Sequence, residues 1–511
     1  MSPNRVSLAP DDAYNHELIG NVRPEPWENP EPSGRYNIVV IGAGTAGLIT
    51  AAVAAGLGAK TALIERHMMG GDCLNVGCVP SKGMIRAARA WAGAANVSEF
   101  GLTFPDTVQR DFGVAMARMR RLRARISKTD SVQRFTSLGV DVFIGDGCFT
   151  GRDTIDVAGK TLRFNRAAIC TGTRAAVPPI PGLANAGYLT NETVFSLTEL
   201  PRRLAVIGGG PIGCELAQAF ARFGSVVTLL ERTAHMLPRE DSDASSIVQD
   251  RMTRDGVTFS FGTSVTDVTA RDAEKLVRYL AGGRSQELAV DEILVAVGRL
   301  PNVEGLGLDT ADVAYDKTGV TVNKRLATSN WRIYAAGDIC CPFKFTHTAE
   351  ALAQIIIQNA LFPHPLGLGR ASTDSLIIPW CTYTEPEIAH VGLYESEARD
   401  KGIDVETFTQ TLKEVDRAIL DGEDEGFARV HVRKGTDEIL GATIVATNAG
   451  NMISEVTVAI KAGVGLGTIG STIHPYPTQA EVLRKAANQM RKARFTDWKK
   501  AILTKRFEWQ R

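Results

Sequence analysis

One pattern occurs twice in this chain, and it constrains the fold more than any other feature. In the first copy, the apolar run 36–41 leads into a turn with the spacing G-x-G-x-x-G, and a small-apolar stretch typical of a helix follows over 48–57. The glycines of this turn are Gly42, Gly44 and Gly47. A further apolar run then ends at Glu65. Strand, glycine turn, helix and strand in this order predict a Rossmann-like unit, which holds a pyrophosphate at the helix N-terminus.

The second copy repeats these elements at a constant offset of 166 residues, as from Gly42 to Gly208. The apolar run 204–207 precedes its turn, and the next apolar run ends at Glu231. Its glycines are Gly208, Gly210 and Gly213. A carboxylate at the end of the second strand can accept hydrogen bonds from a ribose diol, so Glu65 and Glu231 are both candidate ligands. Because the whole pattern recurs in register, we expect two Rossmann-like domains that bind one dinucleotide each.

Two cysteines, Cys73 and Cys78, follow the first unit in the run G-G-D-C-L-N-V-G-C-V-P-S-K. The apolar periodicity of 84–91 predicts a helix that begins near Cys78 or Pro80, and the positive end of a helix dipole stabilises a thiolate. Cys78 is therefore the better candidate for a persistent thiolate. The alternative is two buried cysteines that act as small apolar residues. Glycines beside them permit close approach of the backbone to a ligand, which favours redox chemistry between a thiol pair and a cofactor.

Composition limits the class of protein. The 511 residues are 44% hydrophobic, which describes a globular protein of about three domains. Lys plus Arg and Asp plus Glu are equal at 57 each, so no global field favours nucleic acid or an anionic membrane as a partner. The basic runs 118–125 and 491–505 are expected to be solvated helix faces, and the longest small-apolar stretch, 45–59, is too short to span a membrane.

The termini and the cysteines give further expectations. Residues 1–35 are polar and proline-rich, without the layout of a signal peptide, and we expect an irregular extension over the surface. Eight cysteines in a chain of this length do not predict a secreted disulfide framework, so we expect a reducing cytoplasm. No metal site is predicted. Four cysteines are expected to be buried and structural: Cys148, Cys170, Cys214 and Cys381.

These residues resemble the flavoprotein pyridine nucleotide-disulfide oxidoreductases, a family that includes lipoamide dehydrogenase, glutathione reductase and mercuric reductase. The resemblance covers roughly residues 36–487. Besides the two glycine units and the cysteine run, three further motifs carry it. They are C-T-G-T-R at 170–174, V-A-V-G-R-L-P-N at 295–302 and A-A-G-D at 335–338.

The resemblance implies an α/β fold with two Rossmann-like dinucleotide-binding domains and an α+β C-terminal dimerisation domain. The expected FAD-binding domain comprises 36–183 and 305–372, and the NAD(P)-binding domain comprises 184–304. The interface domain, where the family forms its homodimer, is expected at 373–490. The extension 1–35 and a basic tail, 491–511, complete the chain.

The resemblance also implies the cofactors. The first unit would hold FAD, with Glu65 on the adenosine ribose and Asp338 at the ribityl or pyrophosphate end. The second unit would hold the nicotinamide nucleotide. Glu231 favours NAD because a carboxylate repels a 2′-phosphate, whereas the nearby Arg232 and Arg239 leave NADP open. Further expected cofactor-binding residues are Gly71, Lys82, Thr171, Gly172 and Gly298.

Catalytic roles follow from the same resemblance. Cys78 would be the thiol nearest the flavin, and Cys73 the interchange thiol that faces the acceptor. Lys82 and Glu215 match a pair beside the flavin ring, where a lysine stabilises the negative charge that develops as hydride arrives. A surface-helix salt bridge is the alternative for that pair. Electrons would pass from NAD(P)H through the flavin and a Cys73–Cys78 disulfide to a small acceptor.

The chain departs from the family pattern in the run H-P-Y-P-T-Q-A-E at 474–481. Lipoamide dehydrogenase and glutathione reductase carry a histidine before the Pro-Thr step, hydrogen-bonded to a glutamate five residues on. Here these positions are Tyr476 and Glu481, and a phenol with a pKa of roughly 10 is a poorer base than imidazole. Mercuric reductase resembles this chain in its tyrosine. Two of its marks are nevertheless missing: no vicinal cysteine pair follows Cys381, and no C-x-x-C domain precedes Tyr36.

Three functions therefore stay open. The first is a mercuric reductase-like enzyme that reduces a disulfide, a metal-thiolate or another small acceptor. The second is lipoamide dehydrogenase, and the third is a redox-sensing or electron-carrying flavoprotein without a disulfide substrate. Cys340 and Cys341 are either a second redox or metal pair or a packed, inert pair. His474 either carries protons or is structural.

Overall fold

The computed structural model describes residues 6–95, 97–103, 110–271 and 274–511. The chain is a mixed α/β protein that divides into two compact units. One unit comprises Met1–Ala234 with Asp255–Leu376, and the other comprises His235–Arg254 with Ile377–Arg511. Among the described residues, no helix combines the length and the apolar character needed to cross a membrane.

The first glycine unit belongs to a seven-stranded sheet of order β3-β2-β1-β6-β5-β4, in which β18 also pairs with β6. β1 is parallel to both of its neighbours, and its side chains alternate between two core clusters, so both faces are buried. A strand buried on both faces reads as a continuous apolar run, which explains its sequence. The strands are β1 (Arg35–Ile41), β2 (Thr61–Glu65), β3 (Val140–Ile144), β4 (Gly147–Gly151), β5 (Thr154–Val157), β6 (Lys160–Ile169) and β18 (Ile333–Ala335).

Helices cover this sheet and carry the cysteines. Helix α2 follows the glycine turn and packs against α10, while α4 contacts α3, α5 and α8. Helix α4 begins at Cys78, as expected from the apolar periodicity. The helices are α1 (Ala13–Val22), α2 (Thr45–Gly56), α3 (Gly71–Asn75), α4 (Cys78–Ala95), α5 (Phe112–Ser127), α6 (Val132–Ser137) and α10 (Thr346–Leu361).

The second glycine unit forms a four-stranded parallel sheet of order β10-β9-β8-β14, beside a three-stranded antiparallel sheet, β11-β12-β13. Pro211 at the first turn and the left-handed Gly224 at the end delimit helix α8. The elements are α7 (Leu183–Ala186), β8 (Arg203–Ile207), α8 (Pro211–Phe223), β9 (Val226–Leu230), β10 (Val257–Ser260), β11 (Ser264–Arg271), β12 (Glu274–Ala281), β13 (Arg284–Val290) and β14 (Glu292–Val295). Two separate two-stranded sheets are also present: β7 (Thr173–Ala175) with β15 (Arg299–Pro301), and β16 (Tyr315–Asp316) with β17 (Gly319–Val320), whose Val320 packs in a core cluster of the first sheet.

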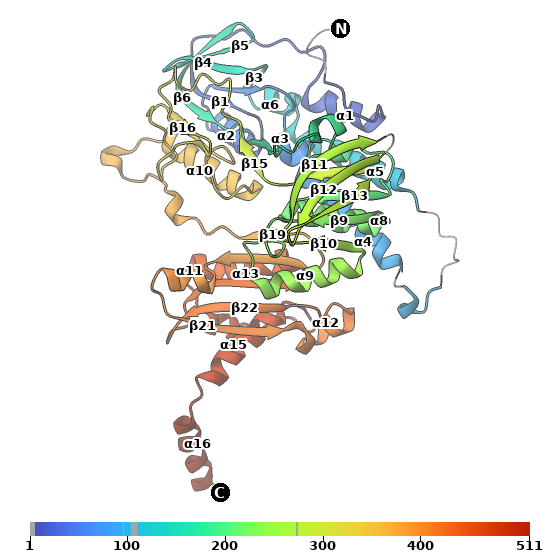
Figure 1. The fold of residues 1–511 in the computed structure, drawn as a ribbon. Coiled ribbons are helices and arrows are strands. Elements are labelled where there is room, and N and C mark those ends of the chain that lie inside the picture. Colours follow the sequence, from blue (N-terminus) through green and yellow to red (C-terminus); the bar gives the residue numbers. More distant parts are fainter. Residues whose placement is uncertain (1–5, 96, 104–109, 272–273) are drawn as a thin grey trace. The chain divides into compact units, whose positions relative to one another are not determined.

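The other unit is built on a five-stranded antiparallel sheet of order β19-β20-β23-β22-β21 (Figure 1). Helix α13 contacts β20 and β23, and α15 contacts β21 and β22. The elements are α9 (Ser242–Arg254), β19 (Trp380–Thr382), β20 (Glu387–Gly392), α11 (Glu395–Asp400), β21 (Val405–Thr411), α12 (Asp416–Asp421), β22 (Phe427–Arg433), β23 (Ile439–Ala446), α13 (Ala449–Ala462), α14 (Leu466–Ser471), α15 (Glu481–Ala493) and α16 (Asp497–Trp509).

The segment 235–254 belongs to this unit because of buried polar contacts. The buried Glu240 carboxylate accepts hydrogen bonds from Trp380 Nε1 at 2.9 Å and from the Tyr394 hydroxyl at 2.7 Å. Arg429 pairs with Asp241 at 2.8 Å. These contacts hold α9 against the antiparallel sheet, whose members are far away in the sequence.

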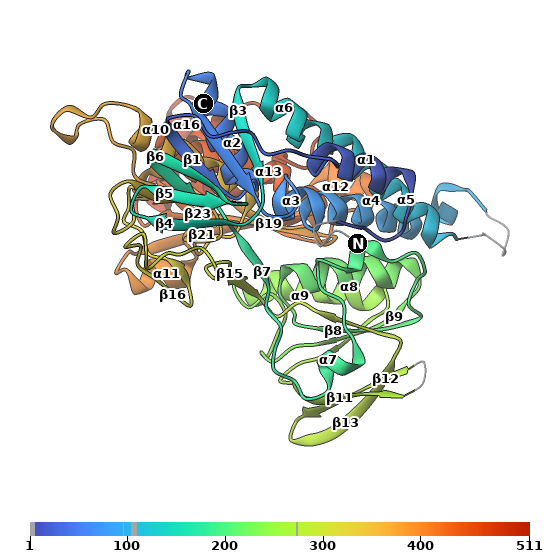
Figure 2. The same ribbon diagram turned by 90° about the horizontal axis from the view of Figure 1, so that it is seen from above.

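The expectation of an irregular N-terminal extension is wrong for Ala13–Val22, which forms helix α1. Figure 2 shows α1 alongside α5, and the contacts between the two helices agree. Leu18 and Val22 are fully buried in the core cluster that also contains the apolar residues of the first glycine unit. Residues 1–5 lie outside the described part of the chain.

The run 118–125 is not simply a solvated helix face, because Arg120 and Arg123 are buried. The Arg120 guanidinium donates to Asp12 at 2.6 Å, and Arg123 donates to the Asn15 side chain at 2.7 Å. The partners lie 108 residues earlier, so a reading of the local sequence misses them. In contrast, α16 in the C-terminal basic run has no buried residue, as expected.

The burial of the cysteines differs in part from the expectation. Cys170 and Cys214 are buried, as predicted, but Cys148 and Cys381 are only partly buried. Both lie on edge strands, β4 and β19, and Cys381 packs against the core cluster of its unit from the outside. The alternative of two buried cysteines at 73 and 78 is wrong as to burial, because Cys73 is partly buried and Cys78 is exposed.

Candidate active site

The three glycines of the first turn meet different neighbours. A Cβ on Gly42 would lie 2.4 Å from the Cys170 carbonyl oxygen, and a Cβ on Gly47 would lie 1.8 Å from the Gly42 carbonyl oxygen. Both positions therefore require glycine for the packing of turn, strand and helix. A Cβ on Gly44 would meet only Gly71, at 3.8 Å. The side of the turn at Gly44 is thus open, and the backbone N–H groups at the start of α2 can bind a phosphate there.

The second turn repeats this division of roles. A Cβ on Gly208 would lie 2.5 Å from the Ala296 carbonyl oxygen, and one on Gly213 would lie 2.0 Å from the Gly208 carbonyl oxygen. A Cβ on Gly210 would meet nothing within 4 Å. The middle glycine is therefore free for a ligand in both units, while the outer two are needed by the fold itself.

The two units also agree in the hydrogen bonds of their glutamates. Glu65 accepts from the backbone N–H groups of Ala43 and His67, both at 2.7 Å. Glu231 accepts from the backbone N–H groups of Gly209 and Thr233, at the same offset of 166 residues. Each carboxylate is thereby fixed beside its glycine turn, with further lone pairs that can accept from a ribose diol.

The surroundings set different pKa values for the two glutamates. Burial raises the pKa of Glu65, although hydrogen bonds from Ala43 and His67 oppose the shift. For Glu231, burial also acts upward, but hydrogen bonds from Thr233 and Gly209 outweigh it and lower the pKa of the carboxyl. Glu231 is therefore ionised at neutral pH.

Gly77 brings the two cysteines together. A Cβ at this position would lie 2.7 Å from the Asp72 carbonyl oxygen and 3.3 Å from Cα of Cys73. Because Gly77 has no side chain, the backbone that leads into Cys78 passes close against α3. The thiols of Cys73 and Cys78 hydrogen-bond to each other as a result.

The surroundings shift the pKa values of the two thiols in opposite directions. The hydrogen bond from Cys73, with the nearby charge of Lys82 and a contact to Thr346, lowers the pKa of Cys78 to about 6, against the opposing effect of burial. The same hydrogen bond, together with burial, raises the pKa of Cys73. The Cys78 sulfur also lies at the first residue of α4 and 3.6 Å from Thr346 Oγ1. At neutral pH the pair therefore holds a thiolate at Cys78 and a thiol at Cys73.

Lys82 lies on α4 one turn after Cys78, and its Nζ donates to Glu215 on α8 at 2.8 Å. The Glu215 side chain is buried, and Lys82 is only partly exposed. The pair therefore differs from a solvated surface salt bridge, which is the alternative that the sequence left open. An ammonium group held in this way lies close enough to stabilise negative charge on Cys78.

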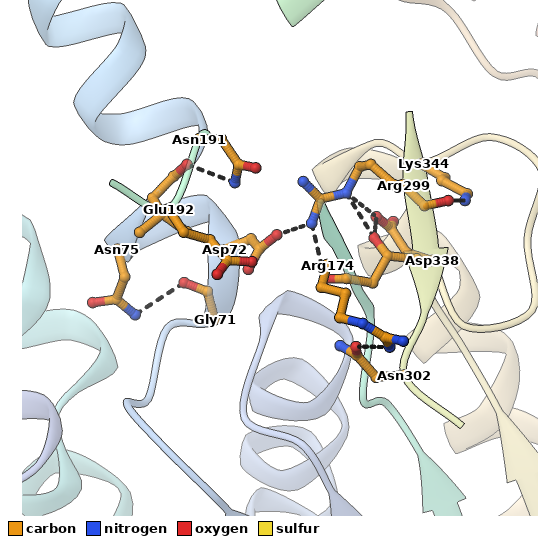
Figure 3. A network of polar contacts seen from close by, with 12 residues as sticks. Gly71, Asp72, Asn75, Arg174, Asn191, Glu192, Arg299, Asn302, Asp338 and Lys344 are labelled. Atoms are coloured by element: carbon orange, nitrogen blue, oxygen red, sulfur yellow. Dashed lines mark hydrogen bonds and ion pairs between the residues drawn. The ribbon is translucent and has the colours of Figure 1, made fainter. Parts of the chain in front are cut away.

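A polar network fixes the short helix that carries Cys73 (Figure 3). The partly buried Arg299 guanidinium binds Asp72, the residue before Cys73, and donates to the Thr173 carbonyl oxygen at 2.9 Å. Thr173 in turn donates from its hydroxyl to Asp338 at 2.9 Å, and Arg299 Nε lies 3.9 Å from the same carboxylate. Arg299 thus links α3, the helix that carries Cys73, to Asp338, the residue expected at the ribityl or pyrophosphate end of FAD.

Two further contacts hold the C-terminal end of this helix. Arg123 donates to the Asn75 carbonyl oxygen at 2.7 Å, and Asn191 donates to the Val76 carbonyl oxygen at 3.2 Å. The Asn75 side chain donates to the carbonyl oxygens of Met69 and Gly71. Gly71 packs back to back with Gly44, because a Cβ at Gly71 would lie 2.7 Å from Cα of Gly44.

The remaining residues expected at the cofactors lie in two connected loops. Thr171 donates from its hydroxyl to the Asn302 carbonyl oxygen at 3.0 Å, and the Asn302 side chain donates back to Thr171 at 2.9 Å. Gly172 and Gly298 both have positive φ, at 63° and 137°, which only glycine adopts without strain. The two sequence motifs are therefore one structural feature.

Tyr476 and Glu481 lie in the compact unit that comprises His235–Arg254 and Ile377–Arg511, and the structure gives them separate partners. The Tyr476 side chain is 71% exposed, and its hydroxyl donates to Asp416 at 2.9 Å. Glu481 is buried and bound by Arg484. The hydrogen bond to Asp416 raises the pKa of Tyr476. The phenol is therefore even less ionised at neutral pH than an unperturbed tyrosine.

His474 has two acceptor partners. Its Nε2 lies 3.0 Å from a carboxylate oxygen of Glu455, and its Nδ1 lies 3.1 Å from the Thr472 carbonyl oxygen. His474 therefore anchors the turn 472–476 to α13, and the side chain is not oriented as a free base.

Cys340 and Cys341 follow Asp338 directly. Burial raises the pKa of both thiols, and that of Cys340 lies well above its ordinary value. Both thiols are therefore less acidic than an ordinary cysteine, which favours the packed pair among the two alternatives.

Sequence reasoning missed four residues of the site: Asp72, Asn191, Arg299 and Thr346. Asp72 and Arg299 lie within motifs that the sequence singled out, so their position beside Cys73 and Gly298 was a usable signal. Asn191 and Thr346 belong to no motif. Their contacts arise only when distant parts of the chain meet.

Family models match most of the chain. The model described as pyridine nucleotide-disulphide oxidoreductase matches residues 36–354. The model of the dimerisation domain of the same family matches residues 378–487.

Individual proteins are similar over nearly their whole length. Mercuric reductase from Staphylococcus aureus is 35% identical over 472 residues, which are 92% of this chain and 85% of that protein. Dihydrolipoyl dehydrogenase from Bacillus subtilis (strain 168) is 30% identical over 472 residues, or 88% of this chain and 97% of that protein. The solved structure of an HOCl-induced flavoprotein disulfide reductase from Escherichia coli has a TM-score of 0.79 and 29% sequence identity, and the match covers 89% of this chain and 99% of that one.

Proposed function

This chain belongs to the pyridine nucleotide-disulphide oxidoreductases, and from this premise we propose that Cys73 and Cys78 pass electrons to a small, soft acceptor such as Hg(II) or a disulfide. Members of the family are enzymes that use FAD and NAD(P)H. The observation that carries the proposal is the asymmetry of the thiol pair, with its thiolate at Cys78 beside Lys82 and its protonated thiol at Cys73.

The residues around the first glycine turn fit FAD. Gly44 leaves the backbone open to a pyrophosphate, and Glu65 can accept from the adenosine ribose. Asp338 follows β18 of the same sheet and accepts a hydrogen bond from Thr173. When bound, the flavin takes up a hydride equivalent from the nicotinamide and makes an electron pair available to the cysteines. Lys82, held by Glu215, stabilises the negative charge on the Cys78 side of the site.

The chemistry at the cysteines balances as follows. Two electrons and one proton break the Cys73–Cys78 disulfide and leave a thiol at Cys73 and a thiolate at Cys78. The reduced pair returns to the disulfide when it gives two electrons to the acceptor and releases the proton of the Cys73 thiol. Reduction of Hg(II) consumes no proton at the acceptor, whereas reduction of a disulfide to two thiols consumes two.

Tyr476 favours an acceptor that needs little proton transfer. Its hydroxyl is bound to Asp416, and its pKa is raised, so it is a poor proton shuttle for the Cys73 thiol. A metal acceptor takes up no proton itself, so the only proton that must move is the one that Cys73 releases. A mercuric reductase-like reaction is therefore proposed over disulfide turnover.

Lipoamide dehydrogenase is the second candidate. Its support is the dihydrolipoyl dehydrogenase of Bacillus subtilis, of which this chain covers 97%. The histidine that the resemblance places before the Pro-Thr step is Tyr476 here, which counts against efficient oxidation of dihydrolipoamide.

For the nicotinamide nucleotide we propose NAD. Glu231 is fixed by Gly209 and Thr233 in a geometry that suits a ribose diol, and its negative charge repels a 2′-phosphate. Arg232 and Arg239 are the residues through which NADP could still bind.

Assembly and location complete the proposal. The match to a dimerisation domain supports a homodimer built on residues 373–490, with FAD bound by 36–183 and 305–372 and the nicotinamide nucleotide by 184–304. A dithiol that cycles with its disulfide works in a reducing compartment, for which we propose the cytoplasm.

Oxidation of NADH by the purified holoenzyme, measured with Hg(II), lipoamide, glutathione disulfide and quinones as acceptors, tests this function. Turnover with Hg(II) that Cys73→Ser abolishes supports the proposal. Turnover with quinones alone, unchanged in Cys73→Ser, contradicts it and favours an electron-carrying flavoprotein.

A further inference from the structure

We propose that the N-terminal segment Ala13–Arg23, which precedes the part matched by the family model, is a clamp that positions the loop between Glu65 and Cys73 and thereby strengthens FAD binding. The proposal rests on the proposed role of the first glycine unit as the FAD site. It concerns residues that the family resemblance does not cover.

The loop in question, 66–70, has no regular secondary structure and joins β2 to α3. Its backbone groups therefore need partners from elsewhere. The Arg23 guanidinium donates to the carbonyl oxygens of Arg66 and His67, both at 2.8 Å, and Arg23 is only 8% exposed. The Val22 carbonyl oxygen accepts from the Met69 N–H at 3.1 Å. Two consecutive residues of the segment thus satisfy three backbone groups of the loop.

These contacts act directly on the Glu65 carboxylate. The His67 N–H that Glu65 accepts belongs to the residue whose carbonyl oxygen Arg23 binds. The positive charge of Arg23 also acts against the pKa increase that burial imposes on Glu65. Arg23 therefore holds the position of the residue expected on the adenosine ribose and favours its ionised form, and we class it as a positioning residue.

The other end of the loop is held through α1. Arg123 donates to the Asn15 side chain on α1 and to the Asn75 carbonyl oxygen at the end of α3. Leu18 and Val22 are fully buried in the cluster that contains Met68, Met69 and Leu74. One short helix is therefore packed against both the ribose end and the cysteine end of the loop.

The segment is attached firmly enough to act in this way. Asp12 caps α1 by accepting from the Asn15 N–H at 2.8 Å, and its other carboxylate oxygen accepts from the buried Arg120 at 2.6 Å. The Asn21 side chain donates to Ser127 at 2.9 Å. These contacts fix α1 on α5 independently of Arg23.

The test is FAD binding by apoprotein in which Arg23 is changed to Ala or to Lys, measured from the quenching of flavin fluorescence on reconstitution. Arg35→Ala is the matched control, because Arg35 also donates to a backbone carbonyl oxygen, that of Phe164, and to a carboxylate, but at the far end of β1. We expect Arg23→Ala to raise the Kd for FAD by about tenfold or more, with partial recovery in Arg23→Lys and little change in Arg35→Ala.

Thermal unfolding of the three apoproteins separates positioning from general stability. The proposal requires that Arg23→Ala remain folded and lose FAD affinity beyond any change in Arg35→Ala. A Kd within twofold of the wild type in folded Arg23→Ala, or equal losses in both variants, would overturn it. Should Arg23→Ala fail to fold, the Kd of Arg23→Lys decides by the same criterion. A wild-type protein that binds no FAD would instead refute the proposed function.

Discussion

The thiols of Cys73 and Cys78 hydrogen-bond to each other, and this contact moves their pKa values in opposite directions. Gly77 makes the contact possible, because any side chain there would collide with α3. The pair is therefore differentiated by the fold itself, before any acceptor binds. We therefore expect different effects when each of the two cysteines is replaced.

Replacing each cysteine by serine separates their roles. In Cys78→Ser we expect the long-wavelength thiolate-to-flavin absorption band to be lost, because the thiolate is removed. In Cys73→Ser we expect the band to persist or increase, while turnover with the acceptor is abolished. Absorption spectra of the reduced variants measure both. A band that survives in Cys78→Ser and disappears in Cys73→Ser would reverse the assignment.

The same band should depend on pH. Because the pKa of Cys78 is lowered to about 6, the thiolate persists above that pH and is lost as the pH falls through it. An ordinary thiol would lose its thiolate already below roughly pH 8.5. In Lys82→Met the midpoint should move upward, since the ammonium that stabilises the thiolate is absent.

A lysine far from the cysteines provides the control for this titration. Lys160 pairs with Glu31, and Lys160→Met should leave the midpoint of the band unchanged. Equal shifts in Lys82→Met and Lys160→Met would show that Lys82 has no specific effect on Cys78.

Two glycines of the second turn should respond differently to alanine. Gly210→Ala places a methyl group in open space, so we expect unchanged thermal stability and an NADH affinity reduced by about tenfold. Gly213→Ala places it 2.0 Å from the Gly208 carbonyl oxygen, so we expect a clear loss of thermal stability. Thermal unfolding and NADH titration measure the two effects. Unaltered NADH affinity in Gly210→Ala would remove this turn from the nucleotide site.

Tyr476→Phe removes the hydroxyl that binds Asp416. Because the hydrogen bond that positions residue 476 on Asp416 is lost, we expect reduction of Hg(II) or of disulfides to be several-fold slower. Reduction of the flavin by the nicotinamide should be unchanged, and stopped-flow measurements of the two half-reactions test both. Tyr315→Phe is the matched control, because Tyr315 is an exposed tyrosine whose hydroxyl contacts Asp309. Identical acceptor kinetics in both variants would make Tyr476 a bystander.

Much of the fold could be predicted because its determinants are local. Gly47 and Gly213 are required by contacts with the Gly42 and Gly208 carbonyl oxygens of their own turns, so the spacing of these glycines records the geometry directly. The same holds for Glu65 and Glu231, whose hydrogen bonds repeat at the offset seen in the sequence.

The features that sequence reasoning missed depend on distant partners. Helix α1 is short and polar, and it is held by Arg120 and Arg123, more than a hundred residues away. Within a basic run, a buried arginine looks the same as a solvated one, because only its partner distinguishes them. The contact of Tyr476 with Asp416 likewise joins two segments that no pattern connects.

Anaerobic titration of the wild-type holoenzyme with NADH tests the central claim most directly. If electrons pass from the flavin to the Cys73–Cys78 disulfide, the enzyme takes up two electrons for the flavin and two for the disulfide, and the long-wavelength band appears during the titration. Uptake of two electrons only, without that band, would contradict the claim that these cysteines are redox partners of the flavin.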